Sequence, residues 1–326
     1  MSIYFLCPDS NNPSGGIRKL YRHVDILNGA GFPAFILHQR SGFRCTWFTN
    51  DTRIAYIPAV IANRDQLASD YLVIPEVYDP NIVNITKGLK KIIFNQGCYN
   101  TFSGYSLNEF DLRTPYHHKE VLATLVVSED SRRYLQYVFP ELKIVRVHNG
   151  IDQSIFSYEP EKKKRQLAFM LHKTPEDVVQ VINILKFRGA LKDFHLAPIE
   201  NRSETEVAAI LKESAIFLSF ATREGFSLPA AEAMACGCIV VGYHGMGGRE
   251  YFKPEFSYPV PIGDVITFAR TVEEVIGTYG ASPEQLMERA ERAASYIRDN
   301  YPLEREEQDI VGFWSSITSM KATETR

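Results

Sequence analysis

The sequence predicts an α/β protein made of two doubly wound domains, each a parallel sheet covered by helices on both faces. Short apolar runs alternate with amphipathic helical stretches along the chain, which is the order that parallel strand–helix–strand units require. The apolar runs are nearly continuous, which indicates strands that are buried on both faces. A chain of 326 residues is long for one core and suits two cores of about 150 residues each.

The first domain is expected to cover residues 1–155. It opens with a strand at 3–7, a helix with apolar residues at helical spacing at 17–27, and a second strand at 34–38. Further apolar runs that continue the same sheet lie at residues 71–74, 92–94, 123–127 and 144–147.

The second domain, residues 156–302, repeats this order, with strands near 167–171, 195–198, 215–220 and 239–241 and helices near 176–187, 204–212, 228–236 and 264–276. The charged stretch 159–165 is interpreted as the linker between the domains, and contact with a membrane surface is the second interpretation. Residues 282–320 predict a helix broken at Pro302. The part after Pro302 carries an apolar stripe of Ile310, Phe313, Trp314 and Ile317.

Composition excludes several classes of protein. The apolar fraction of 45% and the charged fraction of 23% are ordinary for a soluble globular chain. A net charge of −3 argues against nucleic acid as a partner. No run is long enough to span a membrane and the N-terminus lacks a signal peptide, so we expect a cytoplasmic protein. Five cysteines without a C-x-x-C pair favour reduced, mostly buried thiols.

Two carboxylates eight residues apart are the best indication of function. Glu224 is expected at the carboxyl end of the strand 215–220, and Glu232 about two turns into a helix entered through Ser227 and Pro229. Eight residues at roughly 100° each bring Glu232 within about 80° of the starting direction, so both carboxylates are expected to face one crevice. The free N–H groups of residues 226–228 would bind an anion between them.

A carboxylate accepts hydrogen bonds from neighbouring hydroxyls, so this arrangement suits a sugar and a ribose with a diphosphate between them, as in a nucleotide sugar. Taken alone, the same spacing more often reflects a capped turn and a solvated helix residue. Here Gly225, Pro229 and Gly237, the small residues between them and the strand at 238–243 decide the matter. Together they closely resemble the donor-site signature of GT-B fold glycosyltransferases of family 4, the glycosyl transferases group 1.

The resemblance covers most of the chain and is strongest over residues 215–252. It implies two Rossmann-like domains facing a cleft, with a C-terminal helix of about 303–326 that crosses back to the N-terminal, acceptor-side domain. Residues 156–302 would bind the donor. It also implies transfer of a sugar from a nucleoside diphosphate sugar to a hydroxyl of a glycan or glycolipid, with retention at the anomeric carbon and with neither a metal nor a cofactor.

Residue roles follow from the same resemblance. Glu224 would hold the hydroxyls of the transferred sugar, and Glu232 those of the ribose. Lys173, with the amides of Phe226, Ser227 and Leu228, would stabilise the departing diphosphate.

The family usually has an Arg and a Lys at this place. In this chain His172 precedes Lys173, which puts the Arg half of the clamp in doubt. Arg223, beside Glu224, is the candidate substitute.

Weaker candidates lie in the first domain. Gly15 and Gly16 precede a helix and would let the backbone approach a phosphate, or they form a simple tight turn. The family carries a glycine-rich loop here, and Gly16 is the better candidate of the two. Gln96 would contact the acceptor or the sugar. The aromatic residues of the following stretch either stack on an acceptor or belong to the core: Tyr99, Phe102, Tyr105, Phe110 and Tyr116.

Two further segments have open interpretations. Asn149 and Gly150 form a turn that resembles a family segment between the domains and is interpreted as a hinge. Residues 245–250 either bring the backbone close to the donor or form a flexible loop.

Two other functions remain alternatives. A nucleotide-sugar-binding protein without catalysis would use the same residues, and only turnover separates it from an enzyme. An NAD-dependent dehydrogenase is disfavoured because no G-x-G-x-x-G follows the first strand and Gln39 stands where an acid would bind the ribose. The histidines show no metal-ligand spacing, and an Asp-x-Asp carboxylate pair is absent as a clear motif.

Overall fold

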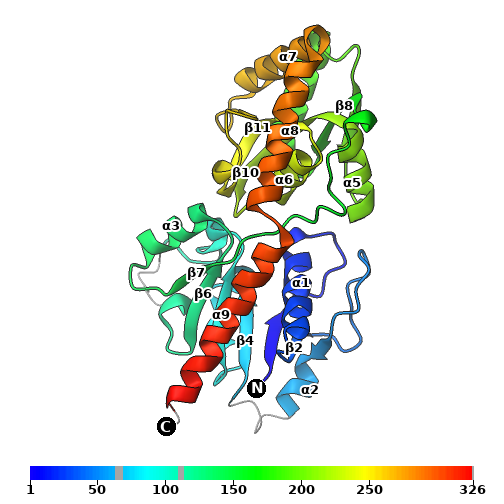
Figure 1. Cartoon of the computed structure of the whole chain (residues 1–326). Helices are drawn as coiled ribbons and strands as arrows, with labels where there is room; N and C mark the ends of the chain where they lie inside the picture. Colours follow the sequence, from blue (N-terminus) through cyan, green and yellow to red (C-terminus); the bar gives the residue numbers. More distant parts are fainter. Residues whose placement is uncertain (63–68, 109–113, 325–326) are drawn as a thin grey trace. The chain divides into compact units, whose positions relative to one another are not determined.

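The computed structural model describes residues 1–62, 69–108 and 114–324. The chain divides into two compact units, Met1–His148 with Glu304–Arg326, and Asn149–Leu303 (Figure 1). The division falls at the Asn149–Gly150 turn, so residues 149–155 belong to the second unit and not, as expected, to the first.

The charged stretch 159–165 is not the linker that the sequence predicted, because it lies inside the second unit. Lys164 and Arg165 already belong to the strand β8, Lys164–Met170. The Lys163 ammonium donates to the carbonyl oxygens of Leu211 and Ser214 at 3.0 and 2.8 Å. These charges therefore fasten the first strand of the second unit to the end of a helix.

In its described residues, the first unit is built on one parallel sheet of seven strands in the order β3-β2-β1-β4-β5-β6-β7. Its strands are β1 Ile3–Leu6, β2 Ala34–His38, β3 Ile54–Tyr56, β4 Tyr71–Pro75, β5 Lys90–Asn95, β6 Val121–Val126 and β7 Ile144–Arg146. Its helices are α1 Gly15–Gly29, α2 Ile57–Ala62, α3 Glu129–Val138 and α9 Leu303–Glu324, with short 3₁₀ helices η2 Glu76–Tyr78, η3 Asn81–Asn84, η4 Cys98–Asn100 and η5 Pro115–His117.

Helix α9 packs on α1 and on the sheet of the first unit (Figure 1). Its predicted apolar stripe is buried, and Trp314 meets Tyr71 of β4 edge to face, with ring centroids 5.4 Å apart. The buried Glu306 carboxylate accepts hydrogen bonds from Lys19 at 2.8 Å and Arg22 at 3.1 Å. Burial disfavours the charged carboxylate, but Lys19 and His23 outweigh it and hold the pKa of Glu306 well below its usual range. The predicted return of the last helix to the N-terminal domain is confirmed.

The second unit is built on a parallel sheet of five strands in the order β12-β11-β10-β8-β9. Its strands are β8 Lys164–Met170, β9 His195–Ile199, β10 Ser214–Glu224, β11 Ile239–Met246 and β12 Tyr258–Pro259. Its helices are α4 Pro175–Phe187, α5 Glu204–Glu213, α6 Leu228–Ala235, α7 Val265–Ala281 and α8 Pro283–Asn300, with 3₁₀ helices η6 Pro160–Lys162 and η7 Gly247–Glu250. Two doubly wound halves are therefore present, as the alternation of the sequence predicted.

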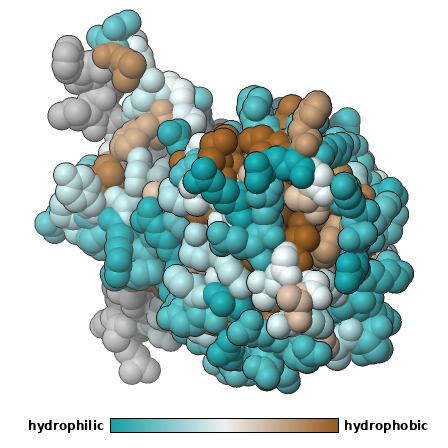
Figure 2. Space-filling model, turned by 90° about the horizontal axis from the view of Figure 1, so that it is seen from above, coloured by the Kyte–Doolittle hydropathy of each residue, from teal (hydrophilic) through white to brown (hydrophobic). Residues whose placement is uncertain are grey.

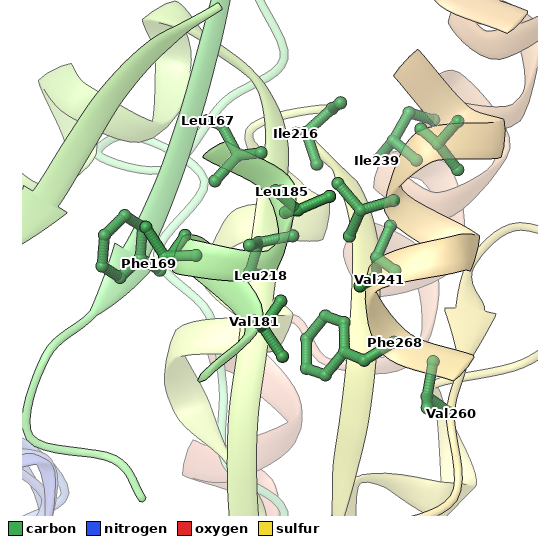
Figure 3. Close-up of a cluster of buried hydrophobic side chains, with 14 of the residues drawn as sticks. Leu167, Phe169, Val181, Leu185, Ile216, Leu218, Ile239, Val241, Val260 and Phe268 are labelled. Carbon is green, nitrogen blue, oxygen red and sulfur yellow. The ribbon is translucent and has the colours of Figure 1, made fainter. Parts of the chain in front are cut away.

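The core of the second unit holds β8 beside β10 (Figure 3). Side chains of three neighbouring strands meet helices α4 and α7 there, and each buried side chain of this size contributes about 1.5–3 kcal/mol. The labelled members of this cluster are Leu167, Phe169, Val181, Leu185, Ile216, Leu218, Ile239, Val241, Val260 and Phe268. Because this packing fixes β8, β10 and β11 in register, it also fixes the loops that leave their carboxyl ends.

Each sheet changes direction at one place. In the second unit the chain runs from β8 outward to β9, then returns to the other side of β8 and continues through β10, β11 and β12. In the first unit the corresponding change lies between β1 and β4. Loops leave such a pair of strands in opposite directions, which opens a crevice outside their carboxyl ends, and ligands of open α/β sheets bind there.

The surface is polar over most of the face shown in Figure 2, with apolar residues in patches between hydrophilic ones. Exposed large apolar side chains of the second unit include Val179 and Phe187 of α4 and Ile266 of α7. Scattered apolar side chains of this kind are normal on a protein surface. Within the described residues, no helix has both the length and the apolar character needed to cross a membrane.

Candidate functional site

The loops after β8 and β10 bring two of the predicted site residues together. The strands pair in parallel, Leu167 with Ile216 and Leu218 with Phe169, so the two loops start from the same edge of the sheet. Lys173 Nζ donates to Glu224 Oε1 at 2.5 Å, and the two side chains are 29% and 28% exposed. This ion pair lies at the place where the direction of the second sheet changes.

The loop that carries Lys173 is fastened to β10. Thr174 precedes α4 in a left-handed conformation, with φ 43°, and its hydroxyl donates to the Phe220 carbonyl at 2.9 Å. The position of the Lys173 backbone is therefore fixed by the sheet, while its side chain keeps access to solvent.

Among the residues that the structure describes, no second cation forms an ion pair with Lys173 or Glu224. Partial desolvation, and next the charge of Lys173, lower the pKa of His172, against the opposing carboxylates of Glu224 and Glu200. His172 is therefore neutral near pH 7 and is not a replacement for an arginine. Arg223 is exposed, and its side chain forms no hydrogen bond or ion pair with any residue that the structure describes.

The segment between the two predicted carboxylates turns sharply before α6. Gly225, Phe226 and Ser227 are buried, and Ser227 has a left-handed backbone, with φ 66° and ψ 65°. Helix α6 begins at Leu228, and the first N–H groups of a helix have no partner within it. In the described part of the chain, the N–H groups of Ser227 and Leu228 donate to no other group. They are therefore able to bind an anion.

Glu232 does not lie about two turns into its helix, as the sequence predicted. Residues up to Glu224 belong to a strand, so a helical count from Glu224 does not apply. Glu232 is the fifth residue of α6, about one turn from its start. Only 5% of the residue is exposed. Its role toward a ribose stays a prediction.

The glycine-rich segment after β11 packs directly on this turn. A Cβ atom at Gly247 would lie 2.0 Å from the Gly225 carbonyl oxygen and 2.4 Å from its carbon. Residues 247–250 form the short helix η7. The segment is thus a packed support for the turn at 225–228, which neither of the two interpretations from the sequence had anticipated.

In the first unit, Gly15 and Gly16 are the first two residues of α1 and do not precede it. The helix starts earlier than expected because the Ser14 hydroxyl accepts a hydrogen bond from the Ile17 N–H at 3.4 Å and caps it. The Gln96 side-chain amide donates to the Gly16 carbonyl at 3.3 Å. Two residues that the sequence proposed separately therefore lie together.

Sequence reasoning missed Glu76, which directly follows β4. It is buried, and its Oε2 atom accepts a hydrogen bond from the Gln96 N–H at 2.9 Å. Burial raises the pKa of Glu76 to about 7. An acid placed directly after the apolar run at 71–75 was the signal that could have identified it. Glu76 fixes the backbone that carries Gln96.

The aromatic residues near Gln96 differ in burial. Tyr116 is buried in the core, where its hydroxyl accepts a hydrogen bond from Asn95 at 2.8 Å. Tyr99 and Tyr105 are half-buried, and their hydroxyls donate to Asp130 and Asp79. Phe102 is 45% exposed. Phe110 lies outside the described residues.

The family model of the glycosyl transferases group 1 matches residues 172–294. This range contains Lys173, Glu224, Glu232 and the whole turn between the carboxylates. Residues 172–294 are a glycosyl transferases group 1 domain.

Other known proteins are similar to this chain over almost its whole length, beyond the group 1 domain. An α-1,6-glucosyltransferase of Actinobacillus pleuropneumoniae serotype 7 (strain AP76) is 25% identical, covering 97% of this chain and 95% of the relative. The solved sucrose-phosphate synthase of Thermosynechococcus elongatus aligns over 98% of this chain and 100% of its own with a TM-score of 0.72 and 11% identity. Anabaena HepE, solved in complex with UDP-glucose, covers 97% and 100% with a TM-score of 0.65 and 12% identity. The predicted GT-B fold is confirmed, and the match to the glycosyl transferases group 1 covers residues 172–294.

The contact between Gly247 and Gly225 gives a stability prediction for the group 1 domain. We expect Gly247→Ala to lower the free energy of unfolding by about 2–3 kcal/mol, because the new methyl group would overlap backbone atoms that have no room to move. Urea unfolding followed by circular dichroism measures this. The control is Gly277→Ala in α7, where nothing lies within 4 Å and a gain of about 0.5–1 kcal/mol is expected. Equal stability of Gly247→Ala and the wild type would contradict this packing.

Proposed function

We propose that the chain is a retaining glycosyltransferase of family 4 that moves a sugar from a UDP-sugar to a hydroxyl of a glycan or glycolipid. UDP-glucose is the first donor to test, since the A. pleuropneumoniae relative is a glucosyltransferase and HepE was solved with UDP-glucose. The observation that carries the proposal is the Lys173–Glu224 ion pair at the change of direction of the sheet, next to unoccupied N–H groups at the start of α6.

The ion pair can exchange partners at low cost. A partly exposed pair of this kind stabilises a protein by about 0–1 kcal/mol, so its opening is readily offset by the binding of a ligand. A diphosphate would accept hydrogen bonds from Lys173 and from the N–H groups of Ser227 and Leu228. This exchange would release the Glu224 carboxylate to accept hydrogen bonds from the hydroxyls of the sugar.

The same groups explain how the reaction would be accelerated. The bond between the anomeric carbon and the phosphate oxygen breaks, and the acceptor oxygen forms a new bond to that carbon on the same face. Negative charge grows on the departing diphosphate, so Lys173 and the two N–H groups stabilise the transition state more than the bound donor. The proton of the acceptor hydroxyl passes to a phosphate oxygen of the leaving UDP.

The first unit would bind the acceptor through residues of its own. Gln96 follows β5 and Gly16 lies at the start of α1, and the two are in contact. They lie beside the change of direction in the sheet of the first unit. Their amide and carbonyl groups suit the hydroxyls of a carbohydrate, and Glu76 holds the Gln96 backbone in place.

We propose further that no divalent metal takes part, because Lys173 and the N–H groups already supply positive charge where the diphosphate would lie. Transfer from UDP-glucose is expected to continue at an unchanged rate in excess EDTA, measured as release of UDP with an acceptor present. Loss of turnover that only Mn²⁺ or Mg²⁺ restores would contradict this assignment.

The roles of Lys173 and Glu224 predict different defects. Lys173→Ala is expected to lower kcat about a hundredfold, the usual effect of removing one group that stabilises developing charge. Glu224→Gln is expected to impair transfer while leaving the affinity for UDP nearly unchanged. Steady-state kinetics and UDP titration of both variants measure this.

The matched control is Lys164→Ala, which breaks the Lys164–Glu213 ion pair of 2.7 Å in the same unit at the opposite end of β8 and should not change kcat. An unchanged kcat in Lys173→Ala would remove Lys173 from the reaction. Tight UDP binding without turnover in the wild type, with any acceptor tried, would instead support the nucleotide-sugar-binding protein.

A further inference from the structure

Tyr251 lies directly after η7 and none of it is exposed. Its hydroxyl lies 2.9 Å from the Phe226 carbonyl oxygen and 2.6 Å from the Ser227 carbonyl oxygen. The ring packs against Phe226 and Tyr301, with centroid distances of 5.1 and 5.9 Å. The single proton of this buried hydroxyl is therefore shared between two consecutive carbonyl oxygens of the turn before α6, in a bifurcated hydrogen bond.

The geometry of the peptide unit determines where two N–H groups point when these carbonyl groups face Tyr251. In a trans peptide unit the C=O and N–H bonds lie in one plane and point in opposite directions. The Phe226 carbonyl shares its unit with the Ser227 N–H, and the Ser227 carbonyl shares its unit with the Leu228 N–H. Because both carbonyls face Tyr251, both N–H groups face away from it.

The turn needs such a hold. Ser227 adopts a left-handed conformation, which costs a residue with a Cβ atom about 1–2 kcal/mol. Burial raises the pKa of Tyr251 well above its usual value, so the hydroxyl keeps its proton and can donate throughout the physiological range. The backbone contact at Gly247 supports the turn from the neighbouring position.

We propose that Tyr251 is a positioning residue for the donor: by holding the carbonyls of Phe226 and Ser227, it aims the N–H groups of Ser227 and Leu228 at the diphosphate. This inference rests on the proposed function. Tyr251 touches no reacting atom, and its effect is confined to the part of the ligand that carries the phosphates.

The test compares UDP with uridine, which lacks the phosphates, by titration calorimetry. Tyr251→Phe removes only the hydroxyl and is expected to weaken UDP binding about tenfold. This is the effect of losing one hydrogen bond between a backbone N–H group and the charged diphosphate. Uridine binding is expected to stay unchanged. Tyr243→Phe is the matched control, since Tyr243 is equally buried in the same unit but donates to Asp177 at 2.8 Å. That control should leave both affinities as in the wild type.

A second variant tests the inference in case Tyr251→Phe does not fold. A Cβ atom at Gly248 would lie 3.2 Å from the Tyr251 hydroxyl oxygen, so Gly248→Ala displaces this hydroxyl while retaining it, and a smaller loss of UDP affinity is expected. Unchanged UDP binding in both variants, or an equal loss of UDP and uridine binding, would overturn the inference. A wild-type protein that binds no UDP would contradict the proposed function instead.

Discussion

The position of β8 between β9 and β10 in an all-parallel sheet is the constraint on which the proposed donor site depends. It places the loop after β8 and the end of β10 at one edge, where Lys173 and Glu224 pair across 51 residues of sequence. The buried cluster between the strands, α4 and α7 maintains this arrangement (Figure 3). The side chains of the site need no contact with one another to be held, because the sheet positions the backbone on which they stand.

Much of the site is made of backbone. Gly247 packs against the Gly225 carbonyl of the turn before α6, and the Tyr251 hydroxyl contacts the carbonyl oxygens of Phe226 and Ser227. We propose that these contacts, and not the side chains of the turn, orient its N–H groups. A site of this kind depends on the conformation of the backbone. It requires few particular side chains, apart from a glycine where two backbone segments come closest.

The sequence predicted the elements that have a clear local pattern of apolar residues. It did not predict elements with a weak pattern, or residues whose role depends on contacts with distant parts of the chain. Apolar runs identified most strands, and the apolar stripe of α9 identified its buried face. Strand β3 and helix α3 escaped because the first is three half-buried residues and the second is mainly polar. The helical count to Glu232 failed since it started in a strand. Tyr251 could not be predicted because its partners lie 24 and 25 residues away.

We propose that the nucleotide lies over the start of α6 with its ribose at Glu232. The most direct measurement is titration calorimetry of the wild type and Glu232→Ala with UDP and with its 2′,3′-dideoxy analogue, in folded protein confirmed by circular dichroism. The wild type should prefer UDP by about 1.5–3 kcal/mol, the value of hydrogen bonds to a charged group, and Glu232→Ala should bind both ligands equally. The same preference for UDP in both proteins would contradict the placement of the ribose at Glu232.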